Sequence, residues 1–338
     1  MRTLLFIILG ILLIVQISVY AQVTKTGTTA AGFLGIDMGP RGTAMGGAYV
    51  SVANDVSAMY WNPAGIARIN GFEASFTNTK WIADLSLNFA GAVLPLGDVG
   101  NIGINATFLT MDQIERTTIS QPEGTGEFFD AGSYAFGLSY ARNLTNQFSI
   151  GVNAKYIDER LYHSSATGFA LDVGALFDTK FYGLMLGMSI SNYGTKLQLD
   201  GRDMDVQHDI DASVSGNNPN INSRLMTDPY DLPLLFRVGV SMDVLKGAAN
   251  SNLIISVDAL HPSDDVDSIN IGGEYVFEEI LYLRAGYKGL FAKDSEYGWN
   301  YGGGIRYSIG GTTIHFDYSY IDFGILKSAH MFNIGLGL

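Results

Sequence analysis

In several strongly patterned segments, charged side chains occupy some of the positions that alternate with the apolar residues. Arginines and carboxylates at such a spacing share one face of a strand, where they could form a track for a charged solute. They could instead pair with one another and with a segment enclosed by the strands. We favour pairing, because an unpaired buried charge costs several kcal/mol. The candidate positions are Asp172, Arg237, Asp243, Asp258, Glu274, Arg284, Arg306 and Asp317.

Catalytic motifs find little support in this chain. The 5 histidines are scattered, with no HExxH pair for zinc and no GxSxG nucleophile motif nearby. A Ser-His pair at a strand rim would have to come from His315 with Ser308 or Ser319. The glycine-rich run from Gly39 to Gly47 matches no phosphate-binding pattern. We expect no enzymatic activity and no cofactor.

Two acidic groups raise the question of a metal site, because carboxylate oxygens suit calcium. Neither follows EF-hand spacing, so we expect solvated loops and no metal. The groups are Asp203, Asp205, Asp209 and Asp211, and Asp264, Asp265 and Asp267. The chain has no cysteine, which excludes disulfides and thiolate sites. A net charge of −13 without a basic cluster argues against a nucleic-acid partner.

The N-terminus has the pattern of a secretory signal peptide. Met1-Arg2 is followed by the apolar run Leu4–Val15, and small residues precede Gln22. We expect residues 1–21 to be cleaved. The alternative is a membrane anchor, but Gln16 and Ser18 interrupt the run before the roughly 20 residues that a spanning helix needs.

The rest of the chain alternates with a period of two, which predicts β-strands. Leu87, Phe89 and Val93 form one such apolar set, and Ile102 and Ile104 begin another. Hydrophobic residues make up 47% of the chain, charged residues only 16%, and there are 41 glycines. The pattern repeats over about 14 segments, an even number as closed bacterial barrels require. We predict an all-β fold, a transmembrane antiparallel barrel.

A membrane barrel and a soluble sandwich differ in which face of the strands, the apolar or the charged one, points outward. In a barrel the apolar sets face lipid and the charged positions line the lumen, whereas a sandwich reverses this sense. Period alone does not decide between them. The leader, the aromatics near strand ends and the unequal loops favour a barrel in the outer membrane of a Gram-negative bacterium, with membrane lipid as its surroundings.

The loops also predict an orientation. Outer-membrane barrels pair short periplasmic turns with longer external loops. We therefore expect Thr110–Gly132 and Tyr193–Pro233 outside and both termini in the periplasm. The second loop is too long for a passive turn and is a candidate lid or docking surface. Closure should pair the strand ending at Leu338 with a first strand near Phe72–Asn78.

A segment rich in small residues, Gly39–Ile69, precedes the strands and is unlike them. We expect residues 22–70 to form a plug inside a barrel of residues 71–338. Within it, Asn62-Pro63-Ala64-Gly65 suits a type I turn. An equally good interpretation makes Asn62 a helix N-cap and Pro63 the first helical residue.

The glycine run, the Asn-Asp pair and the hexapeptide YWNPAG together resemble the N-terminal signature of the PorV/PorQ group of outer-membrane proteins. That group is related to the FadL-type fatty-acid channels, which carry a similar NPAG hatch. Beyond this signature the resemblance is of architecture only. The residues of the plug motif are Gly39, Arg41, Gly46, Gly47, Asn54, Asp55, Tyr60, Trp61, Asn62, Pro63, Ala64 and Gly65.

The resemblance implies two functions. The first is an accessory of type IX protein secretion, a shuttle whose external loops bind exported proteins. The second is a FadL-like channel for long-chain fatty acids or other hydrophobic molecules, opened by movement of the plug or a kinked strand. A channel needs apolar residues pointing inward, and besides Leu176, Met185 and Ile254 the inward positions are mostly Gly, Ser and charge. We therefore favour the shuttle; the plug disfavours a general porin.

Overall fold

The computed structural model describes residues 26–211, 213–216, 218, 220–245, 250–292 and 296–338. The predicted signal peptide lies outside this range. Within the described part of the chain, no helix is long and apolar enough to cross a membrane.

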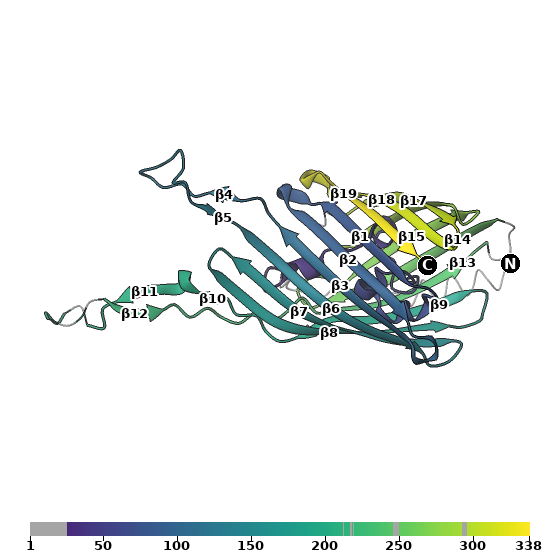
Figure 1. Ribbon diagram of the computed structural model, residues 1–338, viewed down its shortest axis with the longest axis horizontal. Helices are drawn as coiled ribbons and strands as arrows, with labels where there is room; N and C mark the ends of the chain where they lie inside the picture. The colour runs from purple at the N-terminus through teal and green to yellow at the C-terminus, as the bar shows by residue number, and fades with distance from the viewer. Residues whose placement is uncertain (1–25, 212, 217, 219, 246–249, 293–295) are drawn as a thin grey trace.

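Fourteen antiparallel strands form a closed barrel (Figure 1), as the period-two pattern predicts. The strands are β1 (Glu73–Lys80), β2 (Ser86–Pro95), β3 (Asn101–Thr110), β6 (Ala131–Asn143), β7 (Phe148–Leu161), β8 (Ser164–Asp178), β9 (Leu184–Gly194), β13 (Leu235–Asp243), β14 (Ser251–Pro262), β15 (Ser268–Phe277), β16 (Leu281–Leu290), β17 (Trp299–Ile309), β18 (Thr312–Asp322) and β19 (Ser328–Gly337). Each pairs with the strand before and after it in the order of the barrel.

The first and last strands close the barrel. Glu73 in β1 lies opposite Gly337 in β19, and Lys80 lies opposite His330. This confirms the predicted pairing, with β1 shifted by a residue or two toward the C-terminus. Closure leaves no strand of the wall with an unpaired edge, which is what a bilayer demands of a β-structure.

Apolar side chains cover the outside of most strands. Ile104 and Leu138 are each 62% exposed, whereas the inward Glu274 is fully buried. A soluble sandwich would bury the apolar residues, so the sense of the alternation is that of a membrane barrel. The chain is an outer-membrane β-barrel in its architecture.

Strand β2 departs from this rule. Leu87, Phe89 and Val93, expected to face lipid with the other apolar sets, are buried inside the barrel. There they belong to one apolar cluster with Met59 and Ile66. The lipid and this part of the interior are both apolar, so the alternation of β2 reveals its strand character but not which face points outward.

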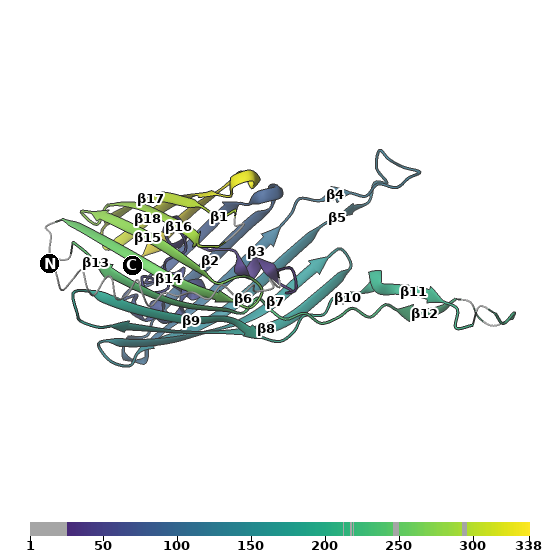
Figure 2. The ribbon, with the colours of Figure 1, turned by 180° about the vertical axis from the view of Figure 1, so that it is seen from behind.

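The two ends of the barrel differ as expected. Short turns join the strands at the end where the C-terminus lies, and two β-ribbons project from the other end (Figures 1 and 2). The ribbons contain β4 (Ile114–Glu115) with β5 (Phe128–Phe129), and β11 (Asp205–His208) with β12 (Ile221–Arg224). The short β10 (Asp200–Gly201) pairs with β8 at the base of the longer ribbon. We call this end the loop end.

Residues 26–72 are here called the inner segment, and most of the residues from Ala31 to Ile69 are enclosed by the wall. The segment contains η1 (Gly32–Gly35), α2 (Pro40–Ala44), α3 (Ala58–Trp61) and η2 (Pro63–Arg68). Met45, Tyr49 and Met59 in this segment have no exposed surface. Further 3₁₀ turns lie between strands or in the long loop, at η3 (Ile82–Asp84), η4 (Gly97–Val99), η5 (Arg202–Met204) and η6 (Gly324–Leu326).

Candidate functional site

A buried ion-pair network joins the inner segment to the wall. Arg41 in α2 donates from Nε and Nη2 to the two carboxylate oxygens of Glu274, at 2.8 and 2.7 Å. Arg284 donates its Nε to the same carboxylate at 2.7 Å and its Nη1 to Asp317 at 2.6 Å. Bidentate Arg–carboxylate pairs are among the strongest polar contacts in proteins. Four of the predicted residues therefore act as one unit.

The other side of Arg41 faces its own segment. Its Nη1 donates to Asn54 Oδ1 at 2.6 Å and lies 3.2 Å from Asp55 Oδ2. Burial alone would raise the pKa of the Asp55 carboxyl, but Arg41 and hydrogen bonds from Ser57 and Tyr49 outweigh burial and lower it. Asp55 therefore stays ionised and is a second carboxylate partner of Arg41.

Two further wall charges fix the middle of the segment. Asp258 in β14 accepts from the backbone N–H groups of Tyr49 and Val50, at 2.7 and 2.8 Å. The guanidinium of Arg237 in β13 lies 5.3 Å from the ring centroids of both Tyr60 and Trp61. Cation–π contacts of this kind strengthen when they are desolvated, as here.

The hexapeptide Tyr60–Gly65 forms the end of α3 and the start of η2. Asn62 caps η2, its Oδ1 accepting from Ala64 N at 3.2 Å, and Pro63 is the first helical residue. The N-cap interpretation of this motif is thus confirmed, and the Gly65 N–H also donates to the Asn62 carbonyl at 2.8 Å, the hydrogen bond expected of the turn. Asn62 Nδ2 also donates to the Val50 and Ala175 carbonyls. A Cβ at Gly65 would lie 2.3 Å from the Ala53 carbonyl oxygen, so no side chain fits there.

Glycines on the wall let the segment approach the strands closely. A Cβ on any of six inward glycines would come within 2.5 Å of an atom of the inner segment. They are Gly151 (against Pro63), Gly174 (against Asn62), Gly187 and Gly239 (both against Val50), and Gly272 and Gly286 (both against Met45). The inner segment also has glycines at such contacts. Gly46, at φ +65°, lies against the Tyr287 backbone. Gly39 and Gly47 adopt positive φ as well. Wall and segment are fitted backbone to backbone.

Of the remaining lumen candidates, Asp172 and Asp243 lie apart from the Arg41 network, whereas Arg306 lines a small pocket together with Arg41 and Asp317. Asp172 in β8 pairs with Lys155 at 2.8 Å and accepts from Asn192 N at 2.7 Å, where the β8–β9 register shifts. Arg306 lies half-buried over the Tyr282 ring, 4.6 Å from its centroid. Asp243 was predicted to line the lumen, but it is the last residue of β13 and accepts from Leu245 N in the adjoining turn. Its position at a strand end keeps it out of the enclosed network.

The main cavity lies at the loop end and was not foreseen from the sequence. It measures about 730 Å³ and is bounded by the ends of β3, β6 and β7 and by the long loop that contains Met226 and Tyr230. Its lining is mostly apolar and includes Leu85, Leu109, Met111, Leu161, Leu197 and Leu199. The loop folding over the barrel mouth creates this lining, so the strand pattern could not reveal it.

The inner segment closes the cavity from below. Phe33 and Leu34 of η1 pack in one buried apolar cluster with Ile157 and Leu197. Glu159 Oε2 accepts from the Ala31 N–H at 2.9 Å and holds this turn against β7. Ala30 is the residue of the inner segment that lines the cavity, and η1 lies directly behind this lining.

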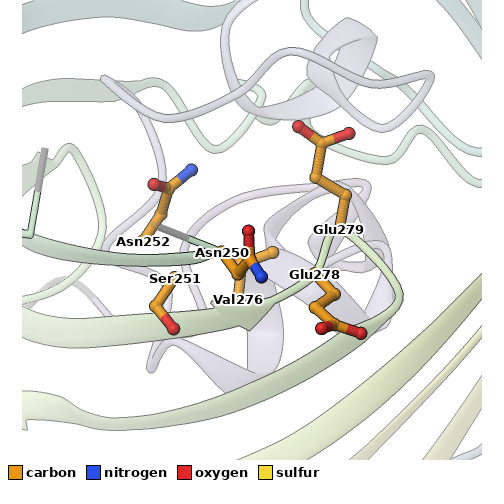
Figure 3. Close-up of a pocket in the computed structure, with 6 residues that line it drawn as sticks. All are labelled: Asn250, Ser251, Asn252, Val276, Glu278 and Glu279. Carbon is orange, nitrogen blue, oxygen red and sulfur yellow. The ribbon is translucent and has the colours of Figure 1, made fainter. Parts of the chain in front are cut away.

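A polar pocket of about 430 Å³ lies at the opposite end of the barrel (Figure 3). It is lined by Asn250, Ser251, Asn252, Val276, Glu278 and Glu279. Glu278 and Glu279 point away from each other, so their carboxylates do not converge on a common ligand (Figure 3).

Most of the other sequence candidates form hydrogen bonds or ion pairs with protein groups. Ser308 Oγ lies 2.8 Å from Thr313 Oγ1, and Ser319 Oγ has no hydrogen-bond partner within the described structure. Asp203 accepts from His163, and Asp205 pairs with Arg224. Asp264 accepts from Thr29 and Asp267 pairs with His261. The described residues contain no cluster of three or more potential metal ligands.

Several solved outer-membrane channels share this fold. A FadL homologue from Pseudomonas aeruginosa aligns over 89% of this chain and 98% of its own, with 13% identity and a TM-score of 0.51. The toluene transporter TodX of Pseudomonas putida aligns over 89% and 97%, at 12% identity and a TM-score of 0.53. The monoaromatic hydrocarbon channel CymD aligns over 88% and 96%, at 11% identity and 0.54. No protein-family model and no curated protein matches the chain. The likeness is one of fold: a FadL-like outer-membrane barrel.

Proposed function

We propose that this protein is a non-enzymatic channel that admits hydrophobic small molecules through the outer membrane. The observation that carries the proposal is the apolar cavity at the loop end, closed below by the inner segment. Concave, mostly apolar sites of this size are typical of small-molecule binding. The fold likeness to channels described as hydrocarbon and toluene transporters supports the same function.

The channel proposal reverses the preference drawn from the sequence alone. That preference rested on inward positions that were mostly Gly, Ser and charge. Leu87, Phe89 and Val93 point inward, and they add an apolar side to the interior. Leu176 is also buried inside, as expected, and Ile254 packs against the same interior cluster.

In this mechanism the inner segment acts as the plug. A hydrophobic molecule leaves the external medium for the cavity because burial of its apolar surface is favourable. Passage requires η1 to move from the cavity floor. The Arg41–Glu274 pair holds the following helix to the opposite wall, so the segment can yield at the cavity without leaving the barrel.

Uptake of radiolabelled naphthalene by Gram-negative cells producing the full chain tests the proposal. Leu109→Trp should narrow the cavity and reduce uptake toward the level of cells without the protein. Ile114→Trp is the matched control, because Ile114 lies on the exposed β4 ribbon outside the cavity. Uptake that is equal with and without the protein, or unchanged in Leu109→Trp, contradicts the proposal.

A role as a docking barrel for exported proteins, as the PorV/PorQ resemblance implies, is the second candidate. The projecting ribbons favour it, since a channel for small molecules does not require ribbons that extend far beyond the barrel (Figures 1 and 2). Mass spectrometry of protein purified from outer membranes tests it. Stoichiometric secreted or type IX secretion proteins, lost on deletion of residues 202–224, would support docking; a bound apolar molecule without protein partners would support the channel.

A further inference from the structure

We infer that the cavity selects by charge, and that it admits uncharged and cationic hydrophobic molecules but rejects organic anions such as fatty-acid carboxylates. This inference rests on the proposed function and adds a specificity that neither the fold nor the apolar lining requires.

The ionisable groups around the cavity have an acidic excess. Glu159, Asp228 and Arg160 are its charged lining residues, so two carboxylates stand against one guanidinium. An apolar site that takes up a carboxylate needs a cation or free N–H donors to replace the water lost by that carboxylate. A carboxylate ligand could therefore bind only if Arg160 or a backbone N–H group is free to contact it.

Arg160 is committed away from the cavity. Its Nε and Nη2 both contact Asp158 Oδ2, at 2.8 and 2.7 Å, and its guanidinium lies 5.6 Å from the Tyr134 ring centroid. Tyr134 shares a strand face with Phe136 and Leu138, which are exposed on the outside of the barrel. The guanidinium is thus neutralised and drawn to the outer surface of the wall.

The donors at the cavity floor are also occupied. Glu159 accepts from the Ala31 N–H with Oε2 and from Ser133 Oγ, at 3.2 Å, with Oε1. A protein carboxylate already holds the position where an anionic headgroup would find these donors. A second carboxylate arriving there would meet a like charge in a partly dehydrated site, which is unfavourable.

Neighbouring cations do not compensate for this. Lys196 pairs with Asp231 at 3.0 Å, and Arg224 pairs with Asp200 and Asp205 on the ribbon. Neither Lys196 nor Arg224 lines the cavity. Among the described residues, the acidic groups therefore set the sign of the potential inside it.

Competition against bound radiolabelled naphthalene tests the inference on the detergent-purified full chain. The competitors are 1-decanol, decylammonium and decanoate, which share one alkyl chain and differ in headgroup charge. We expect decanol and decylammonium to displace naphthalene at concentrations at least about tenfold lower than decanoate, since tenfold corresponds to about 1.4 kcal/mol. The difference between the two ions should shrink at high salt.

The double variant Glu159→Gln with Asp228→Asn assigns the effect to residues. Glutamine keeps an oxygen that accepts from Ala31 N–H, so the cavity floor is preserved. In this variant we expect decanoate to displace naphthalene at a concentration at least about fivefold lower than in the wild type, which corresponds to about 1 kcal/mol. The concentration of decanol needed should stay unchanged. Asp200→Asn is the control, because Asp200 lies on the ribbon and outside the cavity lining.

The outcomes separate the two proposals. If naphthalene does not bind the wild-type protein, the channel proposal itself fails. If it binds and decanoate competes as well as decylammonium, or the double variant leaves decanoate unchanged, charge selection is wrong while the channel stands.

Discussion

The inner segment meets two walls of opposite character. Toward β14–β18 it is held by charge, through Arg41 with Glu274 and the Tyr49 and Val50 N–H groups with Asp258. Toward β2 it is held by apolar packing of Met59 and Ile66 with the inward side chains of that strand, whereas the next strand, β3, adds hydrogen bonds from Asn101 Nδ2 to the Ile66 and Ile69 carbonyls. The cavity lies at the end of β3, β6 and β7, nearer the apolar side.

The difference between the walls indicates which contact can give way. Separating a buried ion pair leaves uncompensated charges, whereas sliding one apolar surface along another breaks no directional bond. In the proposed channel, the charged wall therefore anchors the segment, and a passage for apolar molecules opens along β2.

The largest expected effect comes from breaking the anchor. Glu274→Ala leaves the Arg41 and Arg284 guanidinium groups without their shared carboxylate, and we expect a loss of about 3–5 kcal/mol in the free energy of unfolding. Urea titration of the purified protein measures this loss. Arg224→Ala is the control, since it removes an exposed ion pair worth at most about 1 kcal/mol. Equal losses in the two variants would show that the buried network does not hold the segment.

The apolar wall should respond differently. Leu87→Ala removes an inward side chain that is only 1% exposed, and we expect it to cost about 2–5 kcal/mol in the same titration. It should also raise naphthalene uptake, because it loosens the side along which we expect passage. Leu138→Ala, on the lipid-facing surface, should change neither quantity. Lower uptake in Leu87→Ala would contradict the assignment of the passage to this wall.

A smaller effect is expected where the backbone of the inner segment lies directly against a glycine of the wall. A side chain at Gly272 would lie 2.1 Å from the Met45 carbonyl oxygen, so Gly272→Val should displace the segment at a cost of about 1–3 kcal/mol. The adjacent Gly273 offers a matched control, because its nearest neighbour would be the Ile254 carbonyl oxygen at 3.5 Å. Faster proteolysis of the inner segment in Gly272→Val than in Gly273→Val is the measurement. Equal rates would mean that the close fit at Met45 is not needed.

The fold could be predicted from the sequence because each strand carries its own period-two signal and closure follows from the need to pair every edge. The orientation of β2 could not. Alternation distinguishes apolar from polar faces, but Leu87 and Phe89 face an apolar segment rather than lipid. Only contacts between residues far apart in the chain separate these two environments.

The candidate site was predictable only where the chain itself encodes it. The charges of Arg41, Glu274 and Arg284 were expected to pair because burial without partners is too costly, although their arrangement was not foreseen. The cavity depends on Leu197 and Met226 returning over the barrel mouth. These positions lie in a loop without periodicity, so no local pattern marks them.

The seam between β1 and β19 also has a consequence for the order of assembly. Leu338 N donates to the Phe72 carbonyl oxygen, so the last residue of the chain closes the ring against the residue just before the first strand. Contacts between residues so distant in sequence form slowly, because the chain between them must lose conformational entropy before the contacts can form. The inner segment precedes β1 in the chain. If the barrel closed first, the buried Arg41 could enter it only after breaking the contacts with its partners. Thus the segment should take its place while the wall is still an open sheet, and the last strand to be exported should be the one that encloses it.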